Sequence, residues 1–459
     1  MKGMDRRLVA LLLLAALARG AAVLALQSHR VPNSTYEHGE IAASLVAGRG
    51  FSMHFLGADG PTSQQAPAYP FIVAAAYRIG GVETPASLLI LQLAQAALGG
   101  VMVLGVFRLA SCVAPERPAV AWWGAGVAAV HPTLVYAATH VQVALLAATL
   151  VAWTLVWGLR AAASGSGRDA AAAGLLLALC ALTDPILALA AVGVLVAFRL
   201  GGEGRPIWKP TAVMLGVAGL GVAPWVARNA MVHGEFIPIK STFGYAFWQG
   251  NCAISQGTDK VVRPSVEDVM EGTNTAAGLS DLNRTLWKAR HTAGYIDDVA
   301  FSPEFKRHLG TLPEAERSRV LLRMAIADIW ADPARYAGLC LRRFRYFWLF
   351  DETNPKSRVL VYRASHLTLT GLALLGLATA GAAFRRRSLP LLATAGAIAL
   401  FHALTIVSAR FHIPIEPLMA VWAGAGAAWI VDAATRAVRS RSVAAVGGVE
   451  HVGVVGRLG

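Results

Sequence analysis

Apolar runs long enough to cross a bilayer recur along the whole chain and constrain its fold more than any other feature. They cover residues 8–26, 86–107, 119–138, 141–159, 211–227, 365–384, 389–408 and 414–432. A transmembrane helix needs about 20 mainly apolar residues. The stretch 170–198 is too long for one span and is interrupted at Thr183, Asp184 and Pro185, so we expect two short helices that meet at a polar turn. We therefore predict an all-α polytopic membrane protein with about ten transmembrane helices.

The composition supports this fold class and excludes a soluble one. Of the 459 residues, 56% are hydrophobic and only 15% are charged, and the mean hydropathy is +0.52. Ordinary soluble domains carry about 25% charged residues. The formal net charge of +14 could indicate nucleic acid, but the basic residues are spread through short links instead of forming one basic face. We expect membrane lipids as surroundings and no nucleic-acid partner.

The basic links set the predicted topology. If Lys2 lies in the cytoplasm, alternate counting places the basic links near residues 108–117, 160–168, 199–209 and 385–387 and the arginines of the tail inside. Both termini are then cytoplasmic. Arg19 interrupts the first apolar run, which favours a retained span over a cleaved signal peptide. The alanine- and arginine-rich composition points to a bacterial plasma (inner) membrane.

Two segments remain outside, residues 27–85 and the long stretch 228–366. The predicted organisation is an N-terminal transmembrane module 1–227 that includes the outward loop 27–85, an extracytoplasmic segment 228–366, C-terminal transmembrane helices 367–435 and a cytoplasmic tail 436–459. We expect the outward stretch to be mostly helical, with a loop-rich part at 256–294 and an interfacial helix at 333–350. Cys252 and Cys340 both lie in it, and the sequence leaves open whether they pair.

The first outward loop carries the residues of greatest chemical interest. Residues 33–51 predict a short amphipathic helix that ends at two glycines. Glu37 and Glu40 lie three positions apart at its start and so share one side. Two such carboxylates can act as a general base with a metal ligand or a second acid. Local sequence alone favours a simpler role, acidic first-turn residues of a helix capped by Ser34 or Thr35.

Several strings, taken together, resemble a known superfamily. They are Y-E-H-G-E-I-A-A-S-L-V-A-G-R-G-F at 36–51, G-P-T-S-Q-Q-A-P-A-Y-P-F-I-V-A at 60–74, A-P-W-V-A-R-N at 223–229, D-P-A-R-Y at 332–336 and R-F-H-I-P-I-E-P at 410–417. Their content and order resemble the GT-C superfamily of membrane glycosyltransferases, which includes protein O-mannosyltransferases and aminoarabinose transferases. The strings extend over nearly the whole chain. They do not specify a sugar.

The resemblance implies an inverting transfer of a sugar from a polyprenyl-phosphate donor to an acceptor hydroxyl at the outer face of the membrane. The acceptor is a glycan, a lipid or a protein. Glu37 occupies the position of the family's catalytic acidic residue and would take the acceptor proton. Relatives more often carry aspartate there, so the choice between Glu37 and Glu40 stays open.

A phosphate leaving group requires cations that remain charged in a poorly hydrated site. Arg228 and Arg410 are the first candidates for donor-phosphate binding, with Lys240 and His412 in reserve. Arg19, inside the first span, is expected to approach the lipid phosphate or a carboxylate such as that of Asp184. The sequence identifies no cofactor with certainty; a divalent metal ion is compatible with the carboxylates, but its ligands are unknown.

Two other functions compete with the enzyme. In a transporter or lipid flippase, Arg19 and Asp184 would line a substrate path, but the chain shows no internal repeat. A catalytically inactive relative is the other alternative, because Asp184 departs from the family pattern. The enzyme interpretation requires Glu37, Arg228 and Arg410 to face one outward cavity.

Overall fold

The computed structural model describes residues 5–201, 206–261, 264–272 and 276–450. Lys2 and Arg205, on which the topology argument drew, lie outside the described residues, as does the end of the tail from residue 451. The helices of the membrane part are α1 (Arg6–Leu26), α4 (Pro85–Val113), α5 (Pro118–Val130), α6 (Pro132–Tyr136), η2 (Ala137–Thr139), α7 (Ala144–Ser164), α8 (Gly167–Thr183), η3 (Pro185–Leu189), α9 (Ala190–Gly201), α10 (Trp208–His233), α18 (Leu360–Thr379), α19 (Ala382–Leu404), η5 (Ile413–Ile415) and α20 (Glu416–Glu450).

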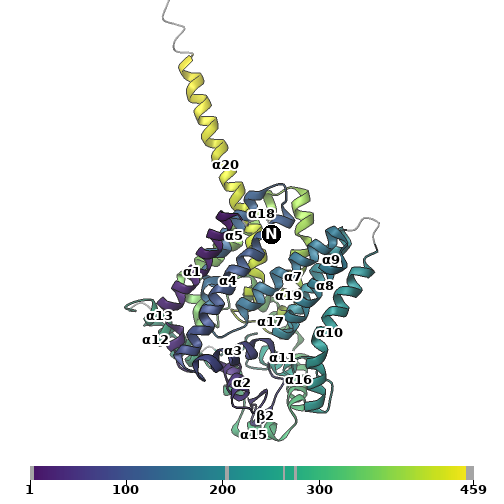
Figure 1. The fold of residues 1–459 in the computed structure, drawn as a ribbon. Helices are drawn as coiled ribbons and strands as arrows, with labels where there is room; N and C mark the ends of the chain where they lie inside the picture. Colours follow the sequence, from purple (N-terminus) through teal and green to yellow (C-terminus); the bar gives the residue numbers. More distant parts are fainter. Residues whose placement is uncertain (1–4, 202–205, 262–263, 273–275, 451–459) are drawn as a thin grey trace, which may run out of the picture.

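The part on the side of α2, which we call the outer part because the sequence predicts it outside the membrane, contains the remaining elements. They are η1 (Ser28–Arg30), α2 (Tyr36–Val46), β1 (Ser52–Phe55), β2 (Ala58–Pro61), α3 (Ala68–Gly80), α11 (Phe243–Asn251), α12 (Pro264–Glu271), α13 (Leu279–Ala293), α14 (Ile296–Ala300), α15 (Pro303–Thr311), α16 (Glu314–Ala331), α17 (Pro333–Trp348) and η4 (Pro355–Arg358). The start of α1 and the projecting end of α20 lie at one end of the molecule, and α2, β2 and α15 lie at the other (Figure 1). The described start of α1 and end of α20 thus lie at the same end of the molecule; the side of the membrane on which they lie stays a prediction.

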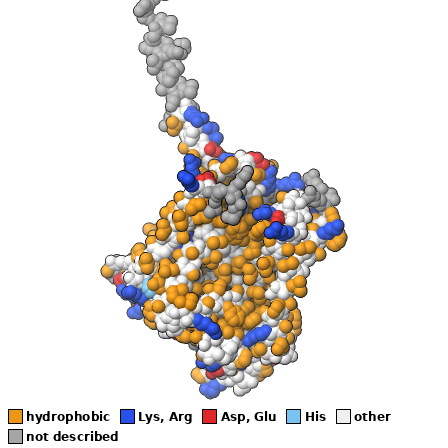
Figure 2. All heavy atoms as spheres, in the orientation of Figure 1, with side chains coloured by type: hydrophobic (Ala, Val, Ile, Leu, Met, Phe, Trp, Pro, Cys, Tyr) orange, Lys and Arg blue, Asp and Glu red, His pale blue; other side chains and the backbone are white. Residues whose placement is uncertain are grey.

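The predicted fold class is confirmed: the chain is an all-α polytopic membrane protein. Within the described residues, seven helices are long and apolar enough to cross a membrane, and the segments Pro118–Val130 and Pro185–Gly201 are shorter apolar helices. Hydrophobic side chains cover the middle of the visible face, and Lys and Arg gather toward its ends (Figure 2). The sequence predicts about ten spans, and seven helices of the described residues reach the length and hydropathy of one.

Two breaks divide apolar stretches, and the sequence predicted one of them. As expected, α8 ends at Thr183 and a short 3₁₀ helix begins at Pro185; the Asp184 carboxylate accepts a hydrogen bond from the Ile186 amide at 3.3 Å. The expected span 119–138 is also broken, at His131, whose backbone is extended (ψ 119°). Pro132 explains this second break, because a proline disfavours helical geometry in the residue before it.

The outer part is more helical than expected. Residues 256–294 were expected to be loop-rich, but they include α12 and α13. The first loop holds the expected short helix α2, followed by an antiparallel hairpin in which Ser52 pairs with Pro61 and Phe55 with Ala58. Its turn places Leu56 and Gly57 at positive φ (48° and 87°), as tight hairpin turns require. The interfacial helix expected near 333–350 is α17.

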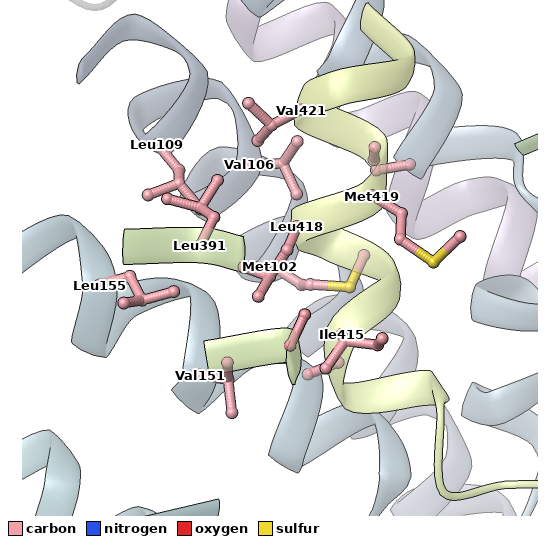
Figure 3. Close-up of a cluster of buried hydrophobic side chains, with 14 of the residues drawn as sticks. Met102, Val106, Leu109, Val151, Leu155, Leu391, Ile415, Leu418, Met419 and Val421 are labelled. Carbon is pink, nitrogen blue, oxygen red and sulfur yellow. The ribbon is translucent and has the colours of Figure 1, made fainter. Parts of the chain in front are cut away.

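The core that supports the outer elements lies between α4, α7, α19 and α20. Figure 3 shows Met102 and Leu109 of α4, Leu155 of α7 and Leu391 of α19 beside Leu418 of α20, and all five are buried. Small residues allow closer contacts around α20: a Cβ at Gly376 of α18 would overlap the Trp422 carbonyl oxygen. This close approach fixes the position of α18 against α20.

We predict that Gly376→Ala lowers the melting temperature in detergent, by overpacking equivalent to about 1–3 kcal/mol. Gly371→Ala, in the same helix, is the matched control, because nothing lies within 4 Å of a Cβ there. Thermal unfolding of the purified chain measures both. Equal melting temperatures for the two variants would contradict the close α18–α20 contact.

Candidate functional site

The helix that carries Glu37 begins in an unusual backbone conformation. Tyr36, its first residue, has φ +48°, a left-handed value that is uncommon for a residue with a side chain. Thr35 occupies the N-cap position but forms no side-chain capping bond; its hydroxyl donates instead to Glu83 Oε1 at 3.0 Å. Within the described part of the chain, the partly exposed Glu37 carboxylate has no hydrogen bond or ion pair. It is therefore available to a ligand.

A pocket at the outer ends of the membrane helices is lined by three cations. Arg290 of α13, Lys356 of η4 and Arg410 face it, and its empty volume, open mouth included, is about 550 Å³. The other lining residues, all in the described part of the chain, include Tyr136, His140, Gln142 and Trp287 and contain no Asp or Glu. Such a pocket is suited to an anion.

Aromatic rings connect this pocket to the start of α2. The ring of Tyr36 stacks on that of Trp287 with centroids 6.0 Å apart, and the ring of His140 stacks on the same indole at 5.0 Å. The guanidinium of Arg290 lies 5.0 Å from the centre of the Tyr36 ring. Glu37 therefore follows directly on a residue that packs against the pocket wall.

Electrostatic effects place two further predicted cations close to α2. Burial, followed by the charges of Lys240 and Arg410, lowers the pKa of His38 to about 3. On the pocket wall, burial lowers the pKa of Lys356 to about 8, with Glu416 opposing and Arg290 reinforcing the effect. Lys356 lies 4.4 Å from the centre of the Tyr362 ring. Lys240 and Arg410 thus lie near enough to His38, the residue after Glu37, to act on its charge.

Three acidic residues act on the buried phenol of Tyr245. Burial raises the pKa of the Tyr245 phenol well above its usual value, and the charges of Asp297, Glu37 and Asp259 add to this rise. Burial also raises the pKa of Asp297. The site therefore joins a cationic pocket to a group of carboxylates, as a reaction that needs both an anion site and a base would require.

Arg228 holds the first loop in place. Its guanidinium donates to the carbonyl oxygens of Thr62 (2.7 Å) and Phe51 (3.1 Å) and to Ser63 Oγ (3.1 Å). It also lies 4.8 Å from the Trp225 ring centre. Neither Arg228 nor Glu37 lines the cationic pocket, whereas Arg410 does.

The remaining predicted residues lie in separate settings. Arg19 is fully buried and donates to the carbonyl oxygens of Ala128 (3.0 Å) and Ala129 (2.9 Å). His412 is buried beside Glu416, with 3.1 Å between Nδ1 and Oε1. Glu40 is exposed and accepts a hydrogen bond from the His54 amide at 2.5 Å.

Sequence reasoning missed Arg290 and Lys356, two of the three pocket cations. Arg290 lies in the stretch expected to be loop-rich, although its neighbours have a helical, amphipathic pattern. Lys356 lies in a short polar link with no motif. A group that could hold a metal ion, His366, His412 and Glu416, was also missed. The four cysteines are free, so Cys252 and Cys340 do not pair.

Comparisons with known proteins give structural matches only. No family model matches the chain, and no curated protein matches it. The chain is similar to the oligosaccharyltransferase AglB from Archaeoglobus fulgidus in complex with an inhibitory peptide and a dolichol-phosphate (TM-score 0.53, 15% identity, 95% of this chain and 52% of that one). An A. fulgidus oligosaccharyltransferase in complex with Zn and sulfate is similar too (TM-score 0.50, 16% identity, 95% of this chain and 51% of that one). ArnT from Cupriavidus metallidurans bound to undecaprenyl phosphate matches with a TM-score of 0.43 and 15% identity, over 93% of this chain and 78% of that one.

The two oligosaccharyltransferase structures show the fold. The chain shares the fold of these oligosaccharyltransferases over 95% of its length. It spans about half the length of those two proteins.

We predict that Arg228→Gln loosens the first loop, because two backbone carbonyl oxygens lose a charged donor. Limited trypsin digestion should then cleave faster after the exposed Arg49. Arg323→Gln, which removes an exposed arginine of α16, should leave that cleavage rate unchanged. Identical digestion of wild type and Arg228→Gln would show that the guanidinium does not hold the loop.

Proposed function

We propose that this chain is an inverting glycosyltransferase that moves a sugar from a polyprenyl-phosphate donor to an acceptor hydroxyl. The observation that carries the proposal is the cationic pocket lined by Arg290, Lys356 and Arg410, next to an unpaired carboxylate, Glu37, in a chain with this fold. The dolichol-phosphate present in the AglB structure supports a lipid-phosphate ligand here. The pocket lies on the outer face of an inner-membrane protein whose termini are cytoplasmic.

The donor phosphate binds at the three pocket cations. Each guanidinium or ammonium can donate hydrogen bonds to phosphate oxygens, and two of the three are arginines, which offer paired donors. Lys240 lies near enough to act on His38 and adds positive charge. Arg228 acts indirectly, because its donors are bonded to the loop that leads from α2.

Glu37 is the general base. It takes the proton of the acceptor hydroxyl while the hydroxyl oxygen attacks the anomeric carbon from the face opposite the phosphate. The bond from that carbon to the phosphate oxygen breaks, and polyprenyl phosphate leaves with the electron pair. Positive charge in the pocket stabilises the leaving phosphate, so no proton needs to be supplied to it. A divalent metal, of the kind present in the Zn complex of a neighbour, is compatible with the carboxylates near Tyr245 and is not required for this step.

A panel of polyprenyl-phosphate sugars tests the proposal. Purified chain should release polyprenyl phosphate from one donor, and Glu37→Gln should slow transfer by at least about 100-fold, because the general base is lost. Glu40→Gln distinguishes the two carboxylates: with Glu37 as the base, transfer continues. Glu304→Gln, in exposed helix α15, controls for loss of a surface charge.

Three outcomes would contradict this assignment. Undiminished transfer by folded Glu37→Gln removes Glu37 as the base. Loss of transfer in Glu40→Gln alone moves the base to Glu40. Translocation of labelled lipid without cleavage of any donor would favour a transporter or flippase.

Donor affinity should also depend on pH. Lys356 and Lys260 both have pKa values lowered to about 8, mainly by burial, so each is protonated below that pH and neutral above it. A phosphodiester donor keeps its charge over this range, and its affinity should fall as pH rises above about 8, at most about tenfold per unit for each lysine. Isothermal titration between about pH 7 and 9 measures this.

Arginine variants assign the dependence to one lysine. Lys356→Arg, which stays charged throughout, should abolish most of the decline, and Lys260→Arg should change it less because Lys260 does not line the pocket. An unchanged pH profile in Lys356→Arg would remove this lysine from the donor site.

A further inference from the structure

Four buried side chains converge behind the cationic pocket. His131 follows α5, His366 lies in α18, His412 precedes η5 and Glu416 is the first residue of α20. They are 0–5% exposed. One ligand atom from each of His366, His412 and Glu416 lies within 4.8 Å of the others, and His131 Nε2 lies 3.5 Å from Glu416 Oε2. Residues from distant parts of the sequence thus surround one point.

Five atoms of this cluster form no hydrogen bond of ordinary geometry. They are Nδ1 of His366, Nδ1 of His412, Nε2 of His131 and both carboxylate oxygens of Glu416. His412 and His131 reach Glu416 only as ion-pair contacts of 3.1 and 3.5 Å, which need both imidazoles to be protonated. Buried polar atoms are nearly always hydrogen-bonded, and an unpaired buried carboxylate is especially costly. Five buried atoms without a hydrogen bond in one cluster therefore indicate a missing partner.

The Nε2 atoms of His366 and His412, which do have hydrogen-bond partners, indicate which kind of ligand fits. His366 Nε2 lies 3.0 Å from the Trp348 carbonyl oxygen, so this nitrogen carries the proton and donates it. His412 Nε2 lies 3.0 Å from the Tyr362 hydroxyl, which can accept in the same way. In a neutral imidazole that is protonated at Nε2, Nδ1 has a free lone pair that can bind a metal ion. This applies to His366 and can apply to His412. Metal-binding histidines characteristically donate their second N–H to a carbonyl or similar oxygen.

We propose that His366, His412 and Glu416, with His131 as a fourth ligand, bind one Zn²⁺ or a similar first-row divalent ion. Imidazole nitrogens with one carboxylate are typical Zn²⁺ ligands, whereas Mg²⁺ and Ca²⁺ prefer oxygen. The cation would neutralise Glu416 and satisfy all the orphaned atoms. Because the ligands are buried, the site is closed and structural, and it is separate from the proposed general base.

The ion would fix the wall of the cationic pocket. It links α18 to the start of α20 and to the break after α5. Arg410 lies two residues before the ligand His412. The Tyr362 hydroxyl is hydrogen-bonded to His412, and the ammonium of Lys356 lies over the Tyr362 ring. Metal binding therefore positions two of the pocket cations, and its test does not depend on any catalytic activity.

Metal content of the full chain, purified without a histidine tag, tests the proposal. We expect about one Zn²⁺ per chain by mass spectrometry, and Co²⁺ added after chelation should give the intense visible absorption of a four-coordinate site. Chelation should lower the melting temperature, and Zn²⁺ should restore it. Failure of the wild-type chain to take up a stoichiometric amount of either ion would overturn the proposal.

Variants identify the ligands. Glu416→Gln and His366→Leu should weaken Co²⁺ binding by at least about tenfold. His402→Ala is the matched control: His402 is equally buried in α19 but its Nδ1 lies 2.9 Å from the Ile406 carbonyl oxygen, so binding should persist. His366→Cys should add a thiolate-to-cobalt charge-transfer band. Metal bound with equal affinity by every variant, with no such band, would place the ion elsewhere and refute this site.

Discussion

Carbonyl groups at broken helix ends are the constraint on which much of this structure depends. In a membrane, each must find a donor within the protein. Proline at position 132 has no N–H, so the Ala128 carbonyl loses its usual helical partner, and Arg19 replaces it. Arg343, fully buried in α17, similarly donates to the carbonyl oxygens of Ala403 (2.7 Å) and Gly250 (2.8 Å). Buried arginines thus allow helices to end where the outer elements need them to end.

This use of arginine separates structural cations from those free to bind a ligand. The donors of Arg19, Arg228 and Arg343 are bonded to backbone oxygens, whereas Arg290 and Arg410 face a pocket without acidic residues. A guanidinium whose N–H groups already donate to backbone oxygens contributes little to an incoming phosphate. The anion site is therefore defined by which cations remain without oxygen partners.

The sequence predicts the fold better than the site, and the reason is physical. Apolar length and cationic links determine spans locally, so α1, α4, α10 and the break at Asp184 could be predicted. The partners of a polar side chain depend on tertiary contacts between distant segments. Nothing near Arg19 indicates that it meets Ala128, and nothing near Lys356 indicates a pocket. The four-residue spacing of His412 and Glu416 was a local signal for the buried cluster, but His366 comes from α18 and His131 from the break after α5.

The hairpin after α2 has a consequence for biosynthesis. Gly57 at its tip packs so closely on α15 that a Cβ would overlap the Lys306 carbonyl oxygen. The neighbouring Ser63 amide donates to Glu314, 251 positions later, at 2.7 Å. During synthesis the first loop is therefore made long before the segment that holds it. Its final shape, and with it the setting of Glu37, is a late event in folding.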